Sequence, residues 1–216
     1  MLANIDFVQV FVTFAVLLFS LTVHETAHAW TADRLGDSTA RILGRISLNP
    51  AVHIDPIGTI VFPLVAMLSN VNFLLGWAKP VPVNISRLGG NWKRKYMLIA
   101  AAGPASNLAL AVVAAVALRL LPSALLEPTA EAALAPVELF LRVGVSLNVL
   151  LAVFNMVPVP PLDGGNVLSG LLRGPAADMF DRLRPYGFMI LYGLMFTNVL
   201  TMIISPPAQA LLYWLL

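Results

Sequence analysis

The stretch from Phe7 to His28 reads FVQVFVTFAVLLFSLTVHETAH, and it decides how this chain folds. It has no charged side chain up to Val23, and it then presents two histidines and Glu25 within five residues. An apolar helix of about 20 residues spans a bilayer. A charged group inside such a segment costs about 2.5–3.5 kcal/mol on insertion scales, so its presence indicates a functional site.

The spacing of these polar residues predicts a metal site. His24 and His28 are four residues apart, so both imidazoles project from one helix face and can hold a single ion. Glu25 follows the first histidine and can reach water activated by that ion. This H-E-x-x-H pattern is typical of zinc hydrolases and here lies in a membrane segment. We therefore expect one Zn²⁺ per chain.

The composition is that of a multi-spanning membrane protein. Of 216 residues, 59% are hydrophobic and only 11% are charged, whereas soluble domains carry about 25% charged residues. There is no cysteine, so any metal must be held by histidine and carboxylate. The net charge of +2 does not indicate a nucleic-acid partner. We expect a single domain over 1–216, with a core at about 6–170 and a C-terminal helix region at 185–216.

Four segments are apolar and long enough to cross the membrane as helices, at about 6–32, 96–121, 134–157 and 186–204. The segment Ile57–Trp77 is also apolar but contains glycine and proline, and Trp77–Val83 then alternates like an edge strand. We interpret this region as a re-entrant hairpin of helix and strand. The predicted fold is an all-α polytopic membrane protein with about four to six transmembrane helices and this hairpin.

The distribution of basic residues predicts the orientation. With a re-entrant hairpin, eleven of the 13 Lys and Arg side chains lie on one side of the membrane, whereas the loop at about 122–133 has none. The positive-inside rule places the eleven in the cytoplasm. We therefore expect a multi-pass protein of the cell membrane, in a bacterium or archaeon. Arg41 and Arg45 are interpreted as residues that face lipid headgroups.

A zinc site needs a third protein ligand, and the sequence offers few candidates. His53 is the only other histidine, and Asp163 ends the run NMVPVPPLD that begins at Asn155. The prolines break the third predicted span near the same membrane depth as His24 and His28, which allows Asp163 to turn inward. Asn107 adds a buried amide near that depth.

Three motifs in this order resemble the site-2 protease family of intramembrane zinc metalloproteases. They are H-E-x-x-H at His24–His28, G-P-x-x-N at Gly103–Asn107, and the N-x-x-P-x-P-x-L-D-G-G type run from Asn155 to Gly165. The resemblance covers about 21–165 and is that of a compact member without a PDZ or nucleotide-sensing domain.

The resemblance implies that His24, His28 and Asp163 bind zinc and that Glu25 is the catalytic acid and base. Asn155 matches a family position associated with substrate or oxyanion binding. Asn107 is a second candidate for the oxyanion contact, and the alternative for Asn107 is a hydrogen bond that only links helices. His53 has two readings: a satisfied residue of an interfacial turn, or a residue near the metal that gates access or positions substrate.

The predicted function is zinc-dependent hydrolysis of peptide bonds in or near transmembrane segments of membrane-protein substrates. The alternative is a catalytically inactive membrane protein that binds metal or helices. Glu25 favours the enzyme, because a purely structural metal site needs no acid or base. The partners are a transmembrane protein substrate and the lipid bilayer, and the oligomeric state is left open. We expect Trp77–Val83 to line the cleft and to pair with unwound substrate.

Overall fold

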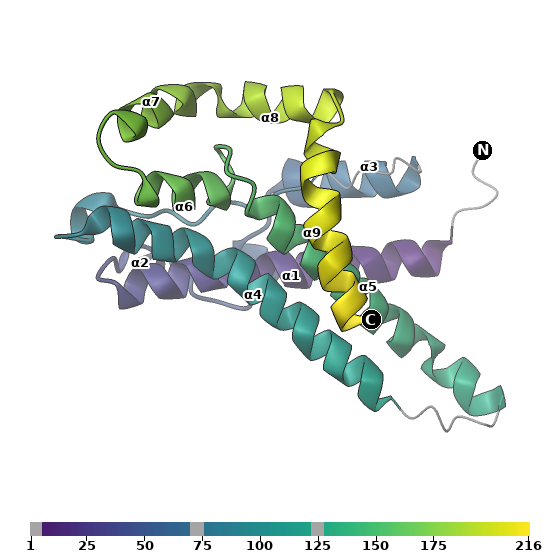
Figure 1. Ribbon diagram of the computed structural model, residues 1–216. Coiled ribbons are helices and arrows are strands. Elements are labelled where there is room, and N and C mark those ends of the chain that lie inside the picture. The colour runs from purple at the N-terminus through teal and green to yellow at the C-terminus, as the bar shows by residue number, and fades with distance from the viewer. Residues whose placement is uncertain (1–5, 70–75, 122–127) are drawn as a thin grey trace.

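The computed structural model describes residues 6–69, 76–121 and 128–216. Within these ranges every regular element is a helix, and no strand is present. The predicted all-α class is therefore confirmed (Figure 1). The elements are α1 (Phe7–Arg34), α2 (Thr39–Ile42), η1 (Pro50–Val52), η2 (Pro56–Val61), α3 (Phe62–Leu68), η3 (Ile85–Arg87), α4 (Trp92–Leu120), α5 (Pro128–Asn155), α6 (Asp163–Leu171), α7 (Pro175–Leu183), η4 (Arg184–Tyr186), α8 (Gly187–Phe196) and α9 (Val199–Leu215).

Three helices are long and apolar enough to cross a membrane, and they match the first three predicted spans. They are α1, α4 and the part of α5 from Leu134 to Asn155. The 28 residues of α1 rise about 42 Å at 1.5 Å per residue. Asp6 caps the start of α1, because its carboxylate accepts the backbone N–H groups of Val8 and Gln9. The cap satisfies donors that the first helical turn leaves without a helical partner.

The fourth predicted span is not one straight helix. The chain bends by 78° between α8 and α9, so a fourth span exists only if this bent pair crosses as a unit. Asn198 lies at the bend with φ of 60°, a left-handed conformation that asparagine tolerates better than most residues. The prediction of a continuous helix over 186–204 was therefore wrong. Apolarity alone does not reveal a single left-handed residue.

The region predicted as a hairpin returns to its starting point. The backbone N–H of Trp77 donates to the Gly58 carbonyl over 3.1 Å, and that of Lys79 donates to the His53 carbonyl over 2.8 Å. The two ends of the segment 58–77 therefore lie side by side, as a re-entrant segment requires. Residues 76–84 are irregular rather than a strand. The first part of the segment, before residue 70, is helical and is formed by η2 and α3.

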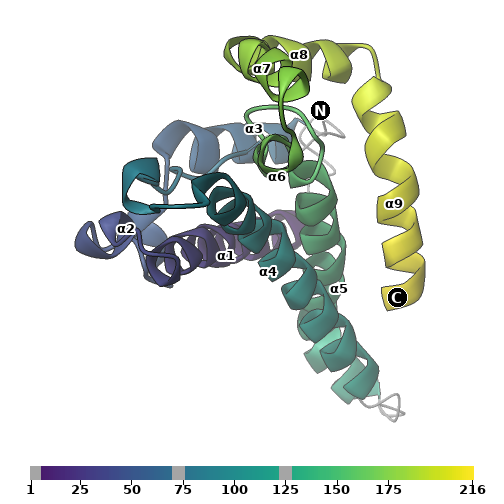
Figure 2. The same ribbon diagram turned by 60° about the vertical axis from the view of Figure 1, so that its left-hand side comes forward.

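The central helix of the fold is α4, which packs against α1, α5 and α6. Figure 1 shows α4 running across α1, with α6 beside its N-terminal half, and Figure 2 shows α9 along the opposite side of α5. An apolar core between α4, α5 and α9 holds this arrangement. Its buried residues include Ala111, Ala115, Val145, Val149, Leu200 and Ile204. Because α4 contacts α1, α5 and α6, it brings residues of these helices to one region of the molecule.

Candidate metal centre

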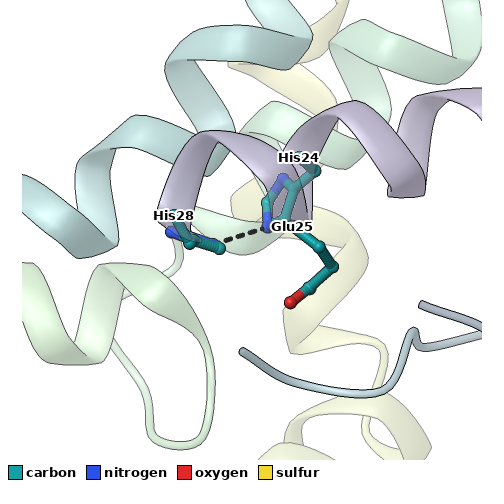
Figure 3. Close-up of side chains that lie close together, drawn as sticks. All are labelled: His24, Glu25 and His28. Carbon is teal, nitrogen blue, oxygen red and sulfur yellow. Dashed lines mark hydrogen bonds between the residues drawn. The ribbon is translucent and has the colours of Figure 1, made fainter. Parts of the chain in front are cut away.

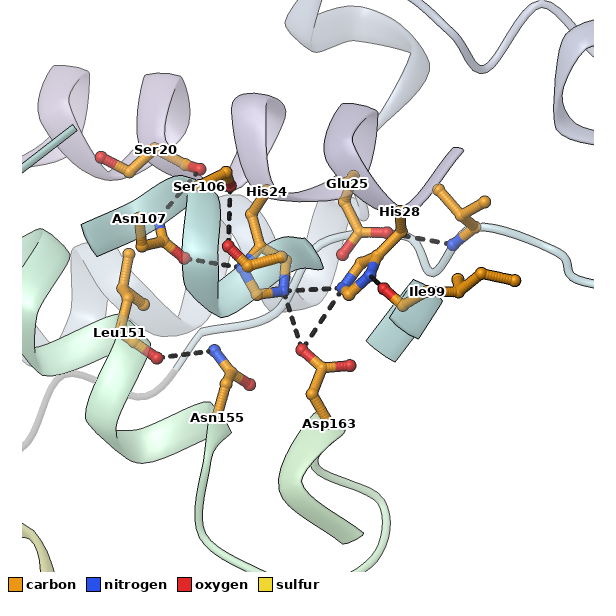
Figure 4. Close-up of polar contacts among 12 residues, drawn as sticks. Ser20, His24, Glu25, His28, Ile99, Ser106, Asn107, Leu151, Asn155 and Asp163 are labelled. Atoms are coloured by element: carbon orange, nitrogen blue, oxygen red, sulfur yellow. Dashed lines mark hydrogen bonds and ion pairs between the residues drawn. The ribbon is translucent and has the colours of Figure 1, made fainter. Parts of the chain in front are cut away.

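Three potential ligand atoms converge where α1 meets α6 (Figure 4). The Nε2 atoms of His24 and His28 lie 3.0 Å apart. The Oδ2 atom of Asp163 lies 3.1 Å from Nε2 of His24 and 3.3 Å from Nε2 of His28. Both histidines are buried. The structure thus brings together the two histidines of the motif and the carboxylate from α6.

The hydrogen bonds of the two rings leave both Nε2 atoms as acceptors. The Nδ1 atom of His28 lies 2.7 Å from the carbonyl oxygen of Ile99. A carbonyl only accepts, so Nδ1 must carry the proton. The Nδ1 atom of His24 lies 2.6 Å from Oδ1 of Asn107, which gives that ring the same tautomer. Two lone pairs and a carboxylate oxygen therefore face one another.

A zinc ion fits this donor set. Tetrahedral zinc binds nitrogen and oxygen at about 2.0–2.2 Å, which separates neighbouring ligand atoms by about 3.3–3.6 Å. The observed separations of 3.0 to 3.3 Å are close to these values. Three acceptors at such short range repel one another unless a cation or proton lies between them. The geometry is therefore that of a centre for one small divalent cation.

Glu25 lies beside the two histidines on α1 (Figure 3). One of its carboxylate oxygens lies within 4.8 Å of a ring nitrogen of His24 and of one of His28. One carboxylate oxygen, Oε2, accepts the backbone N–H of Val81 over 3.0 Å. Glu25 is therefore held by the irregular segment on the far side of the cavity, while Asp163 faces the two imidazoles.

Two glycines allow α6 to begin where it does. A Cβ atom on Gly164 would lie 2.2 Å from the carbonyl oxygen of Met156, and one on Gly165 would lie 2.7 Å from the nitrogen of Pro160. Only glycine permits such close approach of two backbones. The first turn of α6 therefore packs directly on the proline-rich turn, and this contact carries Asp163 to the histidines.

A cavity of about 620 Å³ opens beside the centre. His24, Glu25, His28 and Asp163 line it, together with Asn155. Its other walls are mostly apolar and come from the segment 76–83 and from α4, α5 and α8, and they include Trp77, Val81, Tyr96, Leu151, Phe154, Phe188 and Met195. The expected position of Trp77–Val83 beside the cleft is confirmed. An apolar cleft with few polar groups is typical of a substrate site.

The other predicted site residues have different surroundings. Asn155 ends α5 at the cavity wall, where its Nδ2 atom donates to the Leu151 carbonyl. Asn107 is fully buried, its amide oxygen faces Nδ1 of His24, and it is not among the residues that line the cavity. His53 is also buried, and its Nε2 atom lies 2.9 Å from the Ser47 carbonyl. Burial, with a contribution from Arg45, holds the pKa of His53 below its usual value.

Arg45 does not face lipid headgroups, in contrast to its sequence interpretation. Its side chain is buried and donates to the carbonyl oxygens of Lys79 and Pro80. It thereby fixes the irregular segment at Lys79 and Pro80. Arg41 is exposed and pairs with Asp33. The sequence shows two nearby arginines, and only the folded chain distinguishes them.

Three groups at the centre escape the sequence analysis. They are the backbone N–H of Val81, the carbonyl of Ile99 and the side chain of Asn148. Backbone groups leave no residue-type signal. Asn148 does leave one, because it is a polar residue in an apolar helix, seven positions before Asn155 and hence on the same face.

The fold and the site define an all-α polytopic membrane protein with an H-E-x-x-H helix facing a carboxylate. A family model described as Peptidase family M50 matches residues 12–197. The chain therefore belongs to this family of site-2 proteases, and the resemblance seen in its three motifs is confirmed. No solved structure matches the chain.

Curated bacterial proteins show the same relationship. The chain is 36% identical over 194 residues to "Putative zinc metalloprotease YwhC" of Bacillus subtilis, which covers 90% of this chain and 84% of the relative. It is 32% identical over 200 residues to "Putative zinc metalloprotease Rip2" of Mycolicibacterium smegmatis, covering 91% and 71%. The Rip2 protein of Mycobacterium tuberculosis is 31% identical over 160 residues, covering 72% and 55%.

Proposed function

We propose that this protein is an intramembrane zinc metalloprotease that cleaves peptide bonds in or near transmembrane segments. The observation that carries this proposal is the triangle formed by Nε2 of His24, Nε2 of His28 and Oδ2 of Asp163 beside Glu25. The two histidines and Glu25 belong to α1, which is long and apolar enough to span a bilayer. The names of the relatives support zinc as the metal.

In this proposal His24, His28 and Asp163 hold the zinc ion, and Glu25 is the catalytic residue. Zinc, when bound, polarises the scissile carbonyl and makes water acidic enough to be deprotonated near neutral pH. Glu25 accepts the proton of the attacking water and later delivers it to the leaving amine. One oxygen of its carboxylate, Oε2, accepts the N–H of Val81, which orients the side chain.

Asn155 contributes from the cavity wall. Its amide lies at the end of α5, within the same cavity as Glu25 and Asp163. A side-chain N–H placed there can donate to the oxyanion that develops during attack. Asn107 orients His24 and does not take part in this contact.

The substrate is proposed to bind along the segment 76–83. The N–H groups of Trp77, Lys79 and Val81 all point inward, to Gly58, His53 and Glu25. The opposite edge contains Pro80 and Pro82, which have no N–H. The Pro80 carbonyl already accepts from Arg45, so that edge offers an unwound substrate few donors and only its remaining carbonyl oxygens as acceptors.

The test of the metal ligands compares two substitutions. Purified Asp163→Ala is expected to lose bound zinc and cleavage of a model transmembrane substrate, because two imidazoles alone hold zinc weakly. His53→Gln is the matched control and is expected to keep one zinc ion per chain. Zinc is measured by elemental analysis and cleavage by mass spectrometry. Full zinc binding by Asp163→Ala, or its loss in His53→Gln, would make the ligand assignment wrong.

The proposed orientation puts the basic loops in the cytoplasm. Single cysteines introduced as Arg41→Cys, Arg87→Cys and Asp178→Cys are expected to react with a membrane-impermeant reagent only after the membrane is opened, since all three positions are exposed on the basic side. Thr129→Cys is expected to react in intact cells. The native chain has no cysteine to interfere. Labelling of position 87 in intact cells would contradict both the orientation and the re-entrant hairpin.

A further inference from the structure

A chain of amide hydrogen bonds connects α5 to the first histidine. The Nδ2 atom of Asn148 donates to the carbonyl oxygen of Gly144 over 2.9 Å. The Oδ1 atom of Asn148 accepts from Nδ2 of Asn107, also over 2.9 Å. The Oδ1 atom of Asn107 then lies 2.6 Å from Nδ1 of His24 (Figure 4). The chain thus passes through α5, α4 and α1.

The direction of this chain is fixed at its start. The Gly144 carbonyl can only accept, so it takes the amide N–H of Asn148 and turns Oδ1 of Asn148 toward Asn107. That oxygen in turn attracts Nδ2 of Asn107, which also points at the Ser20 carbonyl, 3.4 Å away. The oxygen of Asn107 is left facing His24. The ring must then donate from Nδ1.

Burial makes the reversed arrangement unfavourable. Asn107 is 0% exposed, Asn148 3% and His24 5%, so water does not replace a lost contact. Turning the Asn107 amide would place its NH₂ group against the ring and its oxygen against the oxygen of Asn148. An unsatisfied buried polar group of this kind costs about 1–3 kcal/mol.

We propose that Asn148 is a positioning residue for the metal centre. It lies one hydrogen bond beyond Asn107, and through that amide it fixes the tautomer of His24 in which Nε2 offers its lone pair to the metal. The inference rests on the proposed function, because that function supplies the zinc ion. Hydrogen-bonding partners behind a metal-bound histidine typically change metal affinity by about 10–100-fold when they are replaced.

A purely structural role for Asn148 makes a different prediction. An asparagine inside a membrane helix can simply hold two helices together, and its loss would then weaken the site whatever residue occupies position 107. The orienting role requires that the Asn107 side chain has one end that only accepts and one that only donates, so that Asn148 can decide which end faces His24. A carboxylate at that position accepts through either oxygen and needs no partner to turn it.

The experiment is a double-mutant cycle on zinc affinity. Wild type, Asn148→Leu, Asn107→Asp and the double variant are purified, stripped of metal and titrated with zinc against a chromophoric chelator. Asn148→Leu is expected to weaken zinc binding by about 10–100-fold. The same substitution in the Asn107→Asp background is expected to cause no further loss. Ser20→Ala is the control, because only the backbone carbonyl of Ser20 faces Asn107.

Each other outcome overturns a specific statement. An equal loss in both backgrounds would make Asn148 a packing residue, and no loss in either would remove it from the centre. Helical content and the thermal midpoint are measured for all variants, and a loss of affinity that tracks a loss of folded protein also counts against orientation. A folded wild type that binds no zinc would refute the proposed function, whereas zinc binding with an additive cycle would refute the role of Asn148 alone.

Discussion

Glu25→Gln is expected to abolish measurable peptide hydrolysis while leaving about one zinc ion per chain. General acid–base catalysis contributes about 10²–10⁴-fold to the rate, and an amide cannot take up the proton of the attacking water. The substitution conserves size, and the amide oxygen can still accept the N–H of Val81. The proposed zinc ligands, His24, His28 and Asp163, do not change. Activity should therefore be lost while the metal content stays at the wild-type level.

The measurement follows cleavage of a model transmembrane substrate in proteoliposomes and zinc content on the same preparation. Glu138→Gln is the matched control, because Glu138 is an exposed carboxylate of α5 that pairs with Arg142. This control is expected to cleave at the wild-type rate. Cleavage by Glu25→Gln within a few fold of wild type would exclude Glu25 as acid and base, and loss of zinc would make it a ligand.

The convergence of His24 and His28 can be predicted from the sequence, because it depends on helical periodicity and residue type. His24 and His28 converge because four residues make about one helical turn. The prolines before Asp163 indicate only that the predicted span breaks near the depth of the histidines, and the choice of Asp163 over His53 rests mainly on the family resemblance. The three long helices are likewise visible as apolar segments.

The sequence fails where contacts depend on tertiary placement. The N–H of Val81 donates to Glu25, which lies 56 positions earlier in the chain. Every residue except proline has a backbone N–H, so the sequence does not indicate which one makes this contact. Arg41 and Arg45 are both basic residues of the same short segment, and nothing in the sequence distinguishes them. Only Arg45 is buried, where it donates to the carbonyls of Lys79 and Pro80. The bend at Asn198 depends on one left-handed residue in an apolar stretch. The first two features are decided by the packing of distant segments, and the third by the backbone conformation of a single residue.

Val81 also changes how the proposed substrate edge can be tested. Its N–H points inward to Glu25 rather than outward to a substrate. A proline at this position would remove the contact to Glu25, the proposed catalytic residue, as well as alter the proposed edge. Ala78 is buried, so the proposed outer edge is tested at Pro80 and Pro82, which are exposed and half-buried.

Gly103 is the position where the smallest substitution is expected to have a very large effect. A Cβ atom on Gly103 would lie 2.4 Å from Nε2 of His28 and 2.6 Å from Nε2 of His24. These are the atoms that face Asp163. The glycine of the G-P-x-x-N motif thus provides room for the two imidazoles to approach each other. Its absent side chain therefore affects the histidines directly, in addition to allowing close packing of helices.

Gly103→Ala is therefore expected to lose zinc and all measurable cleavage, although alanine favours a helix by about 1 kcal/mol over glycine. The methyl group must displace at least one ring, and each ring is held at Nδ1 by Ile99 or Asn107. Zinc content, cleavage and helical content are measured together. Gly193→Ala in α8 is the control, because nothing lies within 4 Å of its added Cβ, and it should keep both zinc and activity. If Gly103→Ala retains full helical content and binds zinc as wild type does, the histidines do not meet beneath α4 as described.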